Sequence, residues 1–333
     1  MNRNLLAAAL VVVGLLCLTS HAQKGRDSIE IVPPKSYTPI KLENATNLQS
    51  MLEAAVNHAV VASPGGKFKP DEIAATLIDL RNPNTSLWAS IRGDEKIYPA
   101  SVVKMFYLAA LERQLADGKL IMTPELNRGL QDMIVVSSNE ATQYILDVLT
   151  DTSSGAELPP KEFAKWQYKR NRVNRFYSAM DYTNINVNQK TFCEDAYGIE
   201  QQSRNYQGQN RNMLTTNATA RLLAEIVTGR MSTPERTKAM MDLLSRDWSK
   251  PSEDPDNQAV GFSGKALIDM KLTGSKLWSK AGWTSKARHD AAYIETPDGL
   301  KFVLVIFTEN HANERETIPA IAAEIIRRMK EAH

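Results

Sequence analysis

The sequence predicts an α+β fold in which strands from both ends of the chain form one antiparallel sheet and the middle forms an all-helical part. Two short apolar segments near the N-terminus and three near the C-terminus have the composition and length of β-strands. Between them, apolar residues recur at helical spacing. Because strands stand at both ends with helices between them, the sheet has to be assembled from segments that are distant in sequence.

The individual elements follow from periodicity and from turn residues. Helices are expected over residues 48–61, 102–150 with breaks at Gly118 and Pro124, 161–180, 215–228 and 315–332. Strands are expected over residues 73–80, 87–91, 276–283, 289–295 and 300–308. Residues 183–212 are rich in Asn and Gln and show little periodicity, which in a compact domain indicates a long functional loop.

The N-terminus has the pattern of a secretory signal peptide. A short basic segment precedes an apolar run over residues 5–18, and Ser20, His21 and Ala22 form a small-residue cleavage site. The apolar run is too short to span a bilayer comfortably. We therefore expect cleavage of residues 1–22 and a soluble periplasmic or secreted protein without membrane attachment; a retained N-terminal anchor is the alternative.

The remaining chain is predicted to consist of an extended leader and one domain. The leader covers residues 23–44 and the domain covers 45–333. Within the domain, the α/β part covers about 45–98 and 230–333, and the helical part covers about 99–229. This length is sufficient for one large hydrophobic core.

Composition and motif searches exclude several classes of protein. The formal net charge is +2, and no basic run is long enough to indicate a nucleic-acid partner. Cleavage after Ala22 would leave Cys193 as the one cysteine, so no intramolecular disulfide is expected. The histidines lack zinc-site spacing, and no G-x-S-x-G or G-x-G-x-x-G motif occurs. We expect no metal, no cofactor and a monomeric protein that acts on a small molecule.

The first candidate site is the pair Ser101 and Lys104. Three residues apart on a helix, the two side chains share one face. Burial of the lysine would lower its pKa until the neutral amine can take the proton of the serine hydroxyl. Pro99 would place Ser101 at the start of the helix, where free backbone N–H groups can stabilise an oxyanion.

Two further motifs accompany this pair. Ser137 and Asn139 lie in a predicted loop between helices, where a hydroxyl can pass a proton to a leaving nitrogen and an amide can hold a substrate amide. Lys280 and Gly282 lie on the first of the three C-terminal strands. The lysine would supply positive charge, and the glycine would let a substrate backbone approach the strand edge.

Taken in order, S-x-x-K, S-x-N and K-x-G resemble the signature of penicillin-recognising serine enzymes. The segments most similar to class A β-lactamases are residues 101–111, 133–144, 214–229 and 289–294. The resemblance covers about residues 45–330 and implies the β-lactamase/transpeptidase-like fold.

The resemblance also implies a role for each motif residue. Ser101 would be the acylated nucleophile, and Lys104 its base or proton relay. Ser137 would donate a proton to the leaving nitrogen, Asn139 would bind the acylamide, and Lys280 would attract the substrate carboxylate. The backbone N–H groups of Ser101 and Trp283 would form the oxyanion hole. Gly282 would border the bound substrate.

The sequence departs from the family pattern on the substrate side. Ser138 stands where the family has Asp, and Ala281 stands where it has a hydroxyl residue. The second change removes a hydrogen bond to the substrate carboxylate, at a cost on the order of 1.5–3 kcal/mol. Thr284, Ser285 or Arg288 would have to substitute for it.

A further departure concerns deacylation. No clear E-x-x-L-N segment occurs where the deacylating carboxylate should lie, and Glu194 is the nearest acid in that loop. Asn188 or Gln189 could orient a water molecule but could not act as a base. The spacing from Ser101 to Ser137 is also short for the family, which indicates a reduced wall on one side of the cleft.

The leading hypothesis is an exported serine hydrolase of the class A β-lactamase type that hydrolyses β-lactams through an acyl-enzyme and so confers antibiotic resistance. The first alternative is a cell-wall peptidase, amidase or esterase for which β-lactams are poor substrates or slow inhibitors. The second is a binding protein that keeps the fold without turnover. The presence of Ser101, Lys104, Ser137 and Lys280 together argues against the second alternative.

Overall fold

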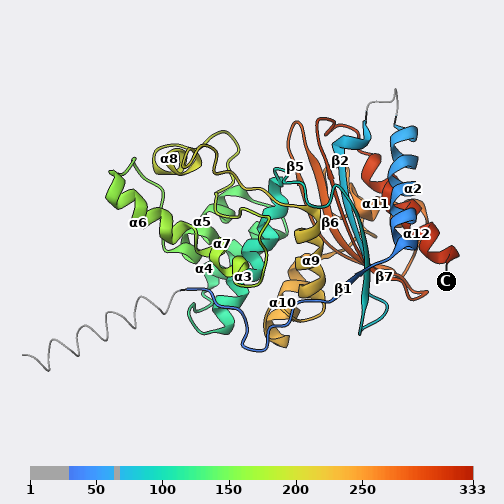
Figure 1. Ribbon diagram of the computed structural model, residues 1–333, viewed down its shortest axis with the longest axis horizontal. Helices are drawn as coiled ribbons and strands as arrows, with labels where there is room; N and C mark the ends of the chain where they lie inside the picture. Colours follow the sequence, from blue (N-terminus) through green and yellow to red (C-terminus); the bar gives the residue numbers. More distant parts are fainter. Residues whose placement is uncertain (1–29, 64–67, 333) are drawn as a thin grey trace, which may run out of the picture.

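The computed structural model describes residues 30–63 and 68–332. Within them, one sheet with the strand order β1-β3-β2-β7-β6-β5-β4 lies beside a group of helices (Figure 1). Its strands are β1 (Leu42–Asn44), β2 (Ile73–Asp79), β3 (Ser86–Ile91), β4 (Ser245–Arg246), β5 (Lys276–Trp283), β6 (Arg288–Glu295) and β7 (Lys301–Thr308). The signal peptide predicted for residues 1–22 lies outside the described residues.

Helices cover both faces of the sheet. The helical elements are α2 (Thr46–Ala62), η1 (Pro70–Glu72), η2 (Ala100–Val103), α3 (Lys104–Ala116), α4 (Pro124–Ile134), α5 (Asn139–Thr150), α6 (Pro160–Arg170), α7 (Arg172–Ser178), α8 (Ile199–Arg204), α9 (Thr216–Val227), α10 (Pro234–Leu244), α11 (Ser263–Asp269) and α12 (Thr317–Glu331). Helices α2, α11 and α12 lie on one face of the sheet, and α9 lies on the other, next to the helical part (Figure 1).

The sheet is buried between two hydrophobic cores, which explains the apolar runs of its central strands. On β7, Phe302, Leu304 and Ile306 join the core under α2 and α12. The alternate residues Val303 and Val305 join the core shared with α9 and the helical part. Successive side chains of a strand point to opposite faces, so a strand covered on both sides reads as a continuous apolar run.

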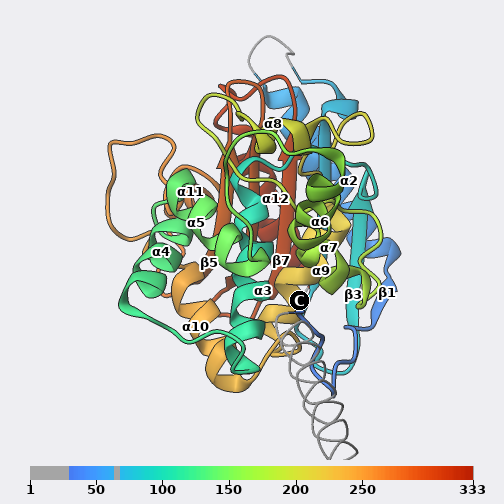
Figure 2. The same ribbon diagram turned by 90° about the vertical axis from the view of Figure 1, so that its left-hand side faces the viewer.

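Helix α3 runs through the middle of the helical part and begins at Lys104 of the S-x-x-K motif, whose Ser101 lies in the preceding η2. It contacts α4, α5, α7 and α10, and Figure 2 shows it from the helical side with the sheet behind it. Most of its side chains, from Lys104 to Leu111, are fully buried. A helix that is apolar all round belongs in a core. Lys104 is therefore buried along with its apolar neighbours.

The structure confirms the predicted α+β fold and corrects it in four places. Strand β1, predicted as part of the leader, pairs parallel with β3, so the sheet is mixed rather than wholly antiparallel. The predicted helix over 161–180 is two helices, α6 and α7, which meet at Asn171. Helix α8 lies inside the predicted loop 183–212. Helix α9, assigned to the helical part, packs directly on the sheet.

No helix among the described residues is long and apolar enough to cross a membrane.

Candidate active site

The turn that carries Ser101 is fixed by a buried histidine. His289, on β6, accepts a hydrogen bond from the Thr308 N–H at Nδ1 (3.2 Å), so its Nε2 carries the proton and donates to the Tyr98 carbonyl (2.9 Å). Burial lowers the pKa of His289 to about 4, which keeps the ring neutral at pH 7. Ala100 then adopts a left-handed conformation (φ 46°) that turns the chain into η2 at Ser101.

Strand β5 packs directly against this turn because residue 282 is glycine. A Cβ atom at Gly282 would lie 2.7 Å from the backbone nitrogen of Ser101 and 2.9 Å from that of Val102. Real Cβ atoms essentially never approach so closely. The sequence predicts a close approach of substrate backbone at Gly282; in the structure the Ser101 turn makes this approach. The third motif is therefore in contact with the first.

Two backbone N–H groups are available at this contact. In an antiparallel ladder, hydrogen bonds alternate between the two edges of a strand. Thr284 donates its N–H to Ala287 on the returning chain (2.8 Å), so the N–H of Trp283 points to the opposite, open edge of β5. The N–H of Ser101 lies against Gly282, next to Trp283. Paired N–H groups of this kind are what an oxyanion hole requires.

Lys104 is 0% exposed, and its surroundings adjust its protonation. Burial lowers the pKa of Lys104 to about 7, against a smaller opposing effect of the nearby Glu140 carboxylate. Its Nζ donates to the carbonyl of Ser137, to the Oγ of Ser137 (3.2 Å) and to Oδ1 of Asn139 (3.0 Å). Lys104 is thus in contact with the second motif, and a substantial fraction of its side chain is neutral at pH 7.

The Ser137 hydroxyl is shared by two lysines. Its Oγ accepts from Nζ of Lys104 (3.2 Å) and from Nζ of Lys280 (2.9 Å). With both lone pairs engaged, the proton of the hydroxyl is left for donation. Ser138 is the N-cap of α5 and accepts from the Ala141 N–H (3.0 Å). Asp and Ser cap helices about equally well, which explains why serine can replace the family's Asp here.

Lys280 has a full set of acceptors. Its Nζ donates to Oγ of Ser137 (2.9 Å), to Oε1 of Gln258 (2.6 Å) and to the carbonyl of Ala281 (2.7 Å). Burial lowers the pKa of Lys280, and the positive charge of Lys104 lowers it further. Three acceptors match the three N–H bonds of an ammonium group. The sequence does not predict Gln258, which lies in a segment without periodicity or motif.

The family described as the beta-lactamase enzyme family matches residues 122–329, which include the second and third motifs. The chain belongs to this family. The match begins after Ser101 and Lys104, so the first motif adds independent support. Among curated proteins, none matches the chain at a significant level.

Solved structures of β-lactamases and related proteins share the fold. A β-lactamase from Sphaerobacter thermophilus DSM 20745 has 18% identity and a TM-score of 0.57, with 85% of this chain and 97% of that chain covered. PBP-A has 17% identity and a TM-score of 0.57, with 88% and 100% covered. A class A β-lactamase from Bacteroides cellulosilyticus DSM 14838 has 12% identity and a TM-score of 0.58, with 86% and 100% covered. These similarities confirm the β-lactamase/transpeptidase-like fold.

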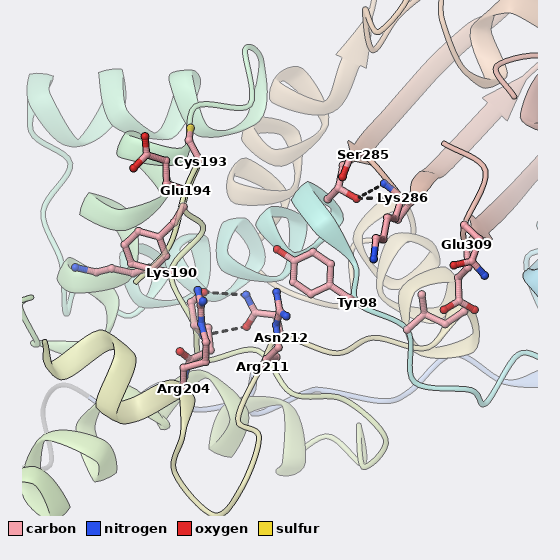
Figure 3. Close-up of a pocket in the computed structure, with 16 residues that line it drawn as sticks. Tyr98, Lys190, Cys193, Glu194, Arg204, Arg211, Asn212, Ser285, Lys286 and Glu309 are labelled. Carbon is pink, nitrogen blue, oxygen red and sulfur yellow. Dashed lines mark hydrogen bonds between the residues drawn. The ribbon is translucent and has the colours of Figure 1, made fainter. Parts of the chain in front are cut away.

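A cavity of about 440 Å³ in this β-lactamase family member lies beside the second and third motifs: Cys193 and Thr284 line it, whereas the motif residues themselves do not. Figure 3 shows Tyr98 between the loop 183–212 on one side and the turn after β5 on the other. Thr284 lines the cavity and caps that turn, because its Oγ1 accepts from the N–H groups of residues 286 and 287. Arg211 lies over the Tyr98 ring at 4.8 Å and brings positive charge to the cavity.

The loop 183–212 reaches the motifs through Cys193. Cys193 is exposed, lines the cavity, and accepts from Nδ2 of Asn139 at its Sγ (3.4 Å). Glu194, the candidate for deacylation, also lines the cavity and is exposed (Figure 3). Among the described residues, Glu194 has no hydrogen bond or ion pair with Ser101 or Lys104.

Other polar residues of this loop are used to hold it in place. Glu200 accepts from Nη1 of Arg170 (2.7 Å), and Lys190 donates to Asp147 (2.6 Å). Lys190 also lies 3.3 Å from Glu200. All but Asp147 are buried. Because Glu200 is already neutralised by two cations, it is a structural acid of the loop.

Arg288, predicted to stand in for the missing hydroxyl at Ala281, points away from the substrate edge of β5. Its Nη1 pairs with Asp256 (2.5 Å), and its Nη2 donates to the carbonyls of Pro255 (3.2 Å) and Gly261 (2.7 Å). Arg288 is 1% exposed. Arg288 is the register partner of Trp283 across β5 and β6, but the hydrogen bonds of its side chain go to the loop before α11.

Among the described residues, no group of three or more His, Cys, Asp and Glu side chains is arranged to hold a metal ion.

Proposed function

We propose that this protein is a serine hydrolase that forms an acyl-enzyme on Ser101 and releases β-lactam acyl groups slowly. The observation that carries the proposal is the convergence of two lysines on the Ser137 hydroxyl: Lys280, and Lys104, which lies one helical turn from Ser101. A base, a proton donor and a positive charge are then available at one point without histidine.

Acylation begins with proton transfer from Ser101. The neutral amine of Lys104 takes the proton of the hydroxyl, and Oγ attacks the carbonyl carbon of the substrate. The negative charge that develops on the carbonyl oxygen is stabilised by the N–H groups of Ser101 and Trp283. The pKa of about 7 for Lys104 supports this step, because an unburied lysine would be fully protonated at neutral pH.

The leaving group is protonated by Ser137. As the carbon–nitrogen bond breaks, the leaving nitrogen takes the proton of the Ser137 hydroxyl. Ser137 regains a proton from Lys104, which received one from Ser101, so the base is neutral again when the acyl-enzyme is complete. Lys280 holds Ser137 in position throughout, through its hydrogen bond to Oγ.

Deacylation needs a base that activates water, and the site supports this step less well. The carboxylate that acts on Lys104 is that of Glu140, which is exposed and accepts from the Ser138 hydroxyl (3.1 Å). Glu194 is exposed and lies in the loop. Lys104 remains as the base for water, and it also serves acylation. We therefore propose that the ester on Ser101 persists.

The enzyme would be exported with removal of residues 1–22 and would act as a monomer on β-lactams or on peptidoglycan-like amides and esters. Rapid β-lactam hydrolysis, with a role in resistance, is the alternative that membership of the β-lactamase family favours.

The test compares the Ser101→Ala variant with the unchanged chain after mixing with benzylpenicillin. The proposal predicts a mass increase of one benzylpenicillin in the unchanged chain, located on the peptide that contains Ser101, and none in the variant. An adduct in both proteins would contradict the assigned nucleophile. No adduct together with drug loss at the same rate in both would contradict the proposed chemistry.

A further inference from the structure

We infer that Gln258 occupies the place beside Lys280 where an anionic group of a substrate would bind, so that the site prefers acyl donors without a carboxylate there. This inference rests on the proposed acylation of Ser101 and specifies its substrate class. The group concerned is on the leaving side of the scissile bond, next to Ser137 and Lys280.

The first support is the saturation of the Lys280 ammonium. Its acceptors are Ser137 Oγ, Gln258 Oε1 and the Ala281 carbonyl, at 2.9, 2.6 and 2.7 Å. A substrate carboxylate could bond to this ammonium only by displacing one of the three. Gln258 makes the shortest of these contacts, and its uncharged oxygen stands where a carboxylate oxygen would gain most from the positive charge.

The orientation of the Gln258 amide is fixed by all of its hydrogen bonds. Nε2 donates to the carbonyls of Ile134 (3.3 Å) and Val135 (2.9 Å) at the end of α4. Oε1 accepts from Lys280 and from the Ala281 N–H (3.2 Å). A flipped amide would place NH₂ against two donors and its oxygen against two carbonyls. Gln258 therefore presents an acceptor to Lys280.

The segment that delivers Gln258 is built to stay in place. Arg288 bonds to its two ends, at Pro255 and Gly261, and pairs with Asp256 between them. A Cβ atom at Gly261 would lie 2.3 Å from the Pro255 carbonyl oxygen, so the segment folds closely on itself. In Figure 2 this segment belongs to the orange loop beside α11. The arginine that the sequence placed at the substrate holds Gln258 instead.

The substitution at residue 281 agrees with this arrangement. The family's hydroxyl at this position is replaced by Ala281, whose N–H is used by Gln258. Both the hydroxyl that would bind a carboxylate and the free N–H of Lys280 are thus missing on the same side of the site. An ester or an internal amide, neutral at this position, leaves the Gln258 contacts intact.

Binding measured without acylation tests this inference. In the Ser101→Ala background, dissociation constants are measured by NMR titration for benzylpenicillin and for its uncharged methyl ester. With Gln258 present, we expect the two constants to agree within about threefold. Gln258→Ala and Gln258→Met free one N–H of Lys280. Because this N–H can then bond to the substrate carboxylate, the dissociation constant of benzylpenicillin should fall about tenfold and that of the methyl ester should not change.

Gln49→Ala, which removes an amide on α2, is the matched control and should change neither constant. Tenfold tighter binding of benzylpenicillin than of its ester before any change at Gln258 would overturn the inference. So would an unchanged ratio in both Gln258 variants, or no binding of benzylpenicillin to either of them. If the role of Gln258 were purely structural, its substitution would weaken the binding of both compounds by the same factor. Acylation of Ser101 is followed separately in the unchanged chain, so failure of the proposed function is recognised independently.

Discussion

The two halves of the site differ in how their polar side chains are held. Around Ser137, Lys104 and Lys280 are fully buried and bonded to several partners. In the loop 183–212, Glu194 is exposed, and Glu200 is paired with Arg170 of α6 and lies 3.3 Å from Lys190 of the same loop. The residues that form an acyl-enzyme are therefore preorganised, whereas no carboxylate of the described loop is positioned to activate the water that would hydrolyse it.

Lys104→Ala is the change with the largest expected effect on the preorganised half. It removes the proposed base, and general-base catalysis typically contributes about 10²–10⁴ in rate. We expect the rate of adduct formation with benzylpenicillin, followed by intact mass, to fall by at least about 10². Lys265→Ala, on the surface of α11, is the control. An unchanged acylation rate in Lys104→Ala would show that this half of the site is not organised around Lys104 as the base.

Gly282→Ala tests whether contact between β5 and the Ser101 turn matters for the oxyanion. The new Cβ would lie 2.7 Å from the Ser101 nitrogen, which forces the two N–H groups apart. Loss of one oxyanion donor lowers the rate by a factor of about 10²–10³. We expect the acylation rate of Gly282→Ala to decrease by a factor in this range or by a somewhat smaller one. An Ala variant that is stably folded and acylates at the original rate would show that the contact has no part in the chemistry.

The pH dependence of acylation tests the protonation of Lys104. Burial lowers the pKa of Lys104 to about 7, and the neutral amine is the reactive form. The acylation rate should therefore increase about tenfold per pH unit below pH 7 and level off above about pH 8. Lys280 and Glu140 are the other charged groups beside Lys104 or Ser137. A rate that is constant or falls from pH 6 to 8 would contradict Lys104 as the base.

Glu194→Gln has the smallest expected effect and tests whether the loop 183–212 takes part in deacylation. An exposed carboxylate without a partner in the described structure should contribute less than about twofold to the loss of the acyl-enzyme, because a general base has to reach the water that it activates. Glu157→Gln, also exposed, is the matched control. A hundredfold slower deacylation in Glu194→Gln alone would assign the base to this loop after all.

The sequence predicts the parts of the site that depend on local spacing. Ser101 and Lys104 share one turn of helix, and Lys280 lies on a strand that the apolar pattern identifies. Two groups could not be predicted. Gln258 is defined by its contacts with α4 and β5, and the role of His289 depends on the distant Tyr98 carbonyl. Such contacts follow from tertiary packing, which no local pattern encodes.

The same distinction explains the errors in the fold. Helix α3 is apolar all round, whereas α5 and α9 have strong apolar periodicity, and the predicted helices agree with all three within a few residues. Strand β1 has three residues, of which two are exposed, so its parallel pairing with β3 leaves no signal in the sequence. Arg288 begins β6, one residue before the predicted strand 289–295, and the ion pair with Asp256 directs its side chain away from the role that the sequence predicts for it.

The most direct test of the contrast between the two halves is the lifetime of the acyl-enzyme. The purified protein is mixed with excess benzylpenicillin, the free drug is then removed, and intact mass is followed over time. Our expectation is an adduct of one benzylpenicillin on Ser101 that forms in most of the protein and persists after the drug is gone. Disappearance of the adduct as fast as it forms, with catalytic loss of the drug, would contradict it.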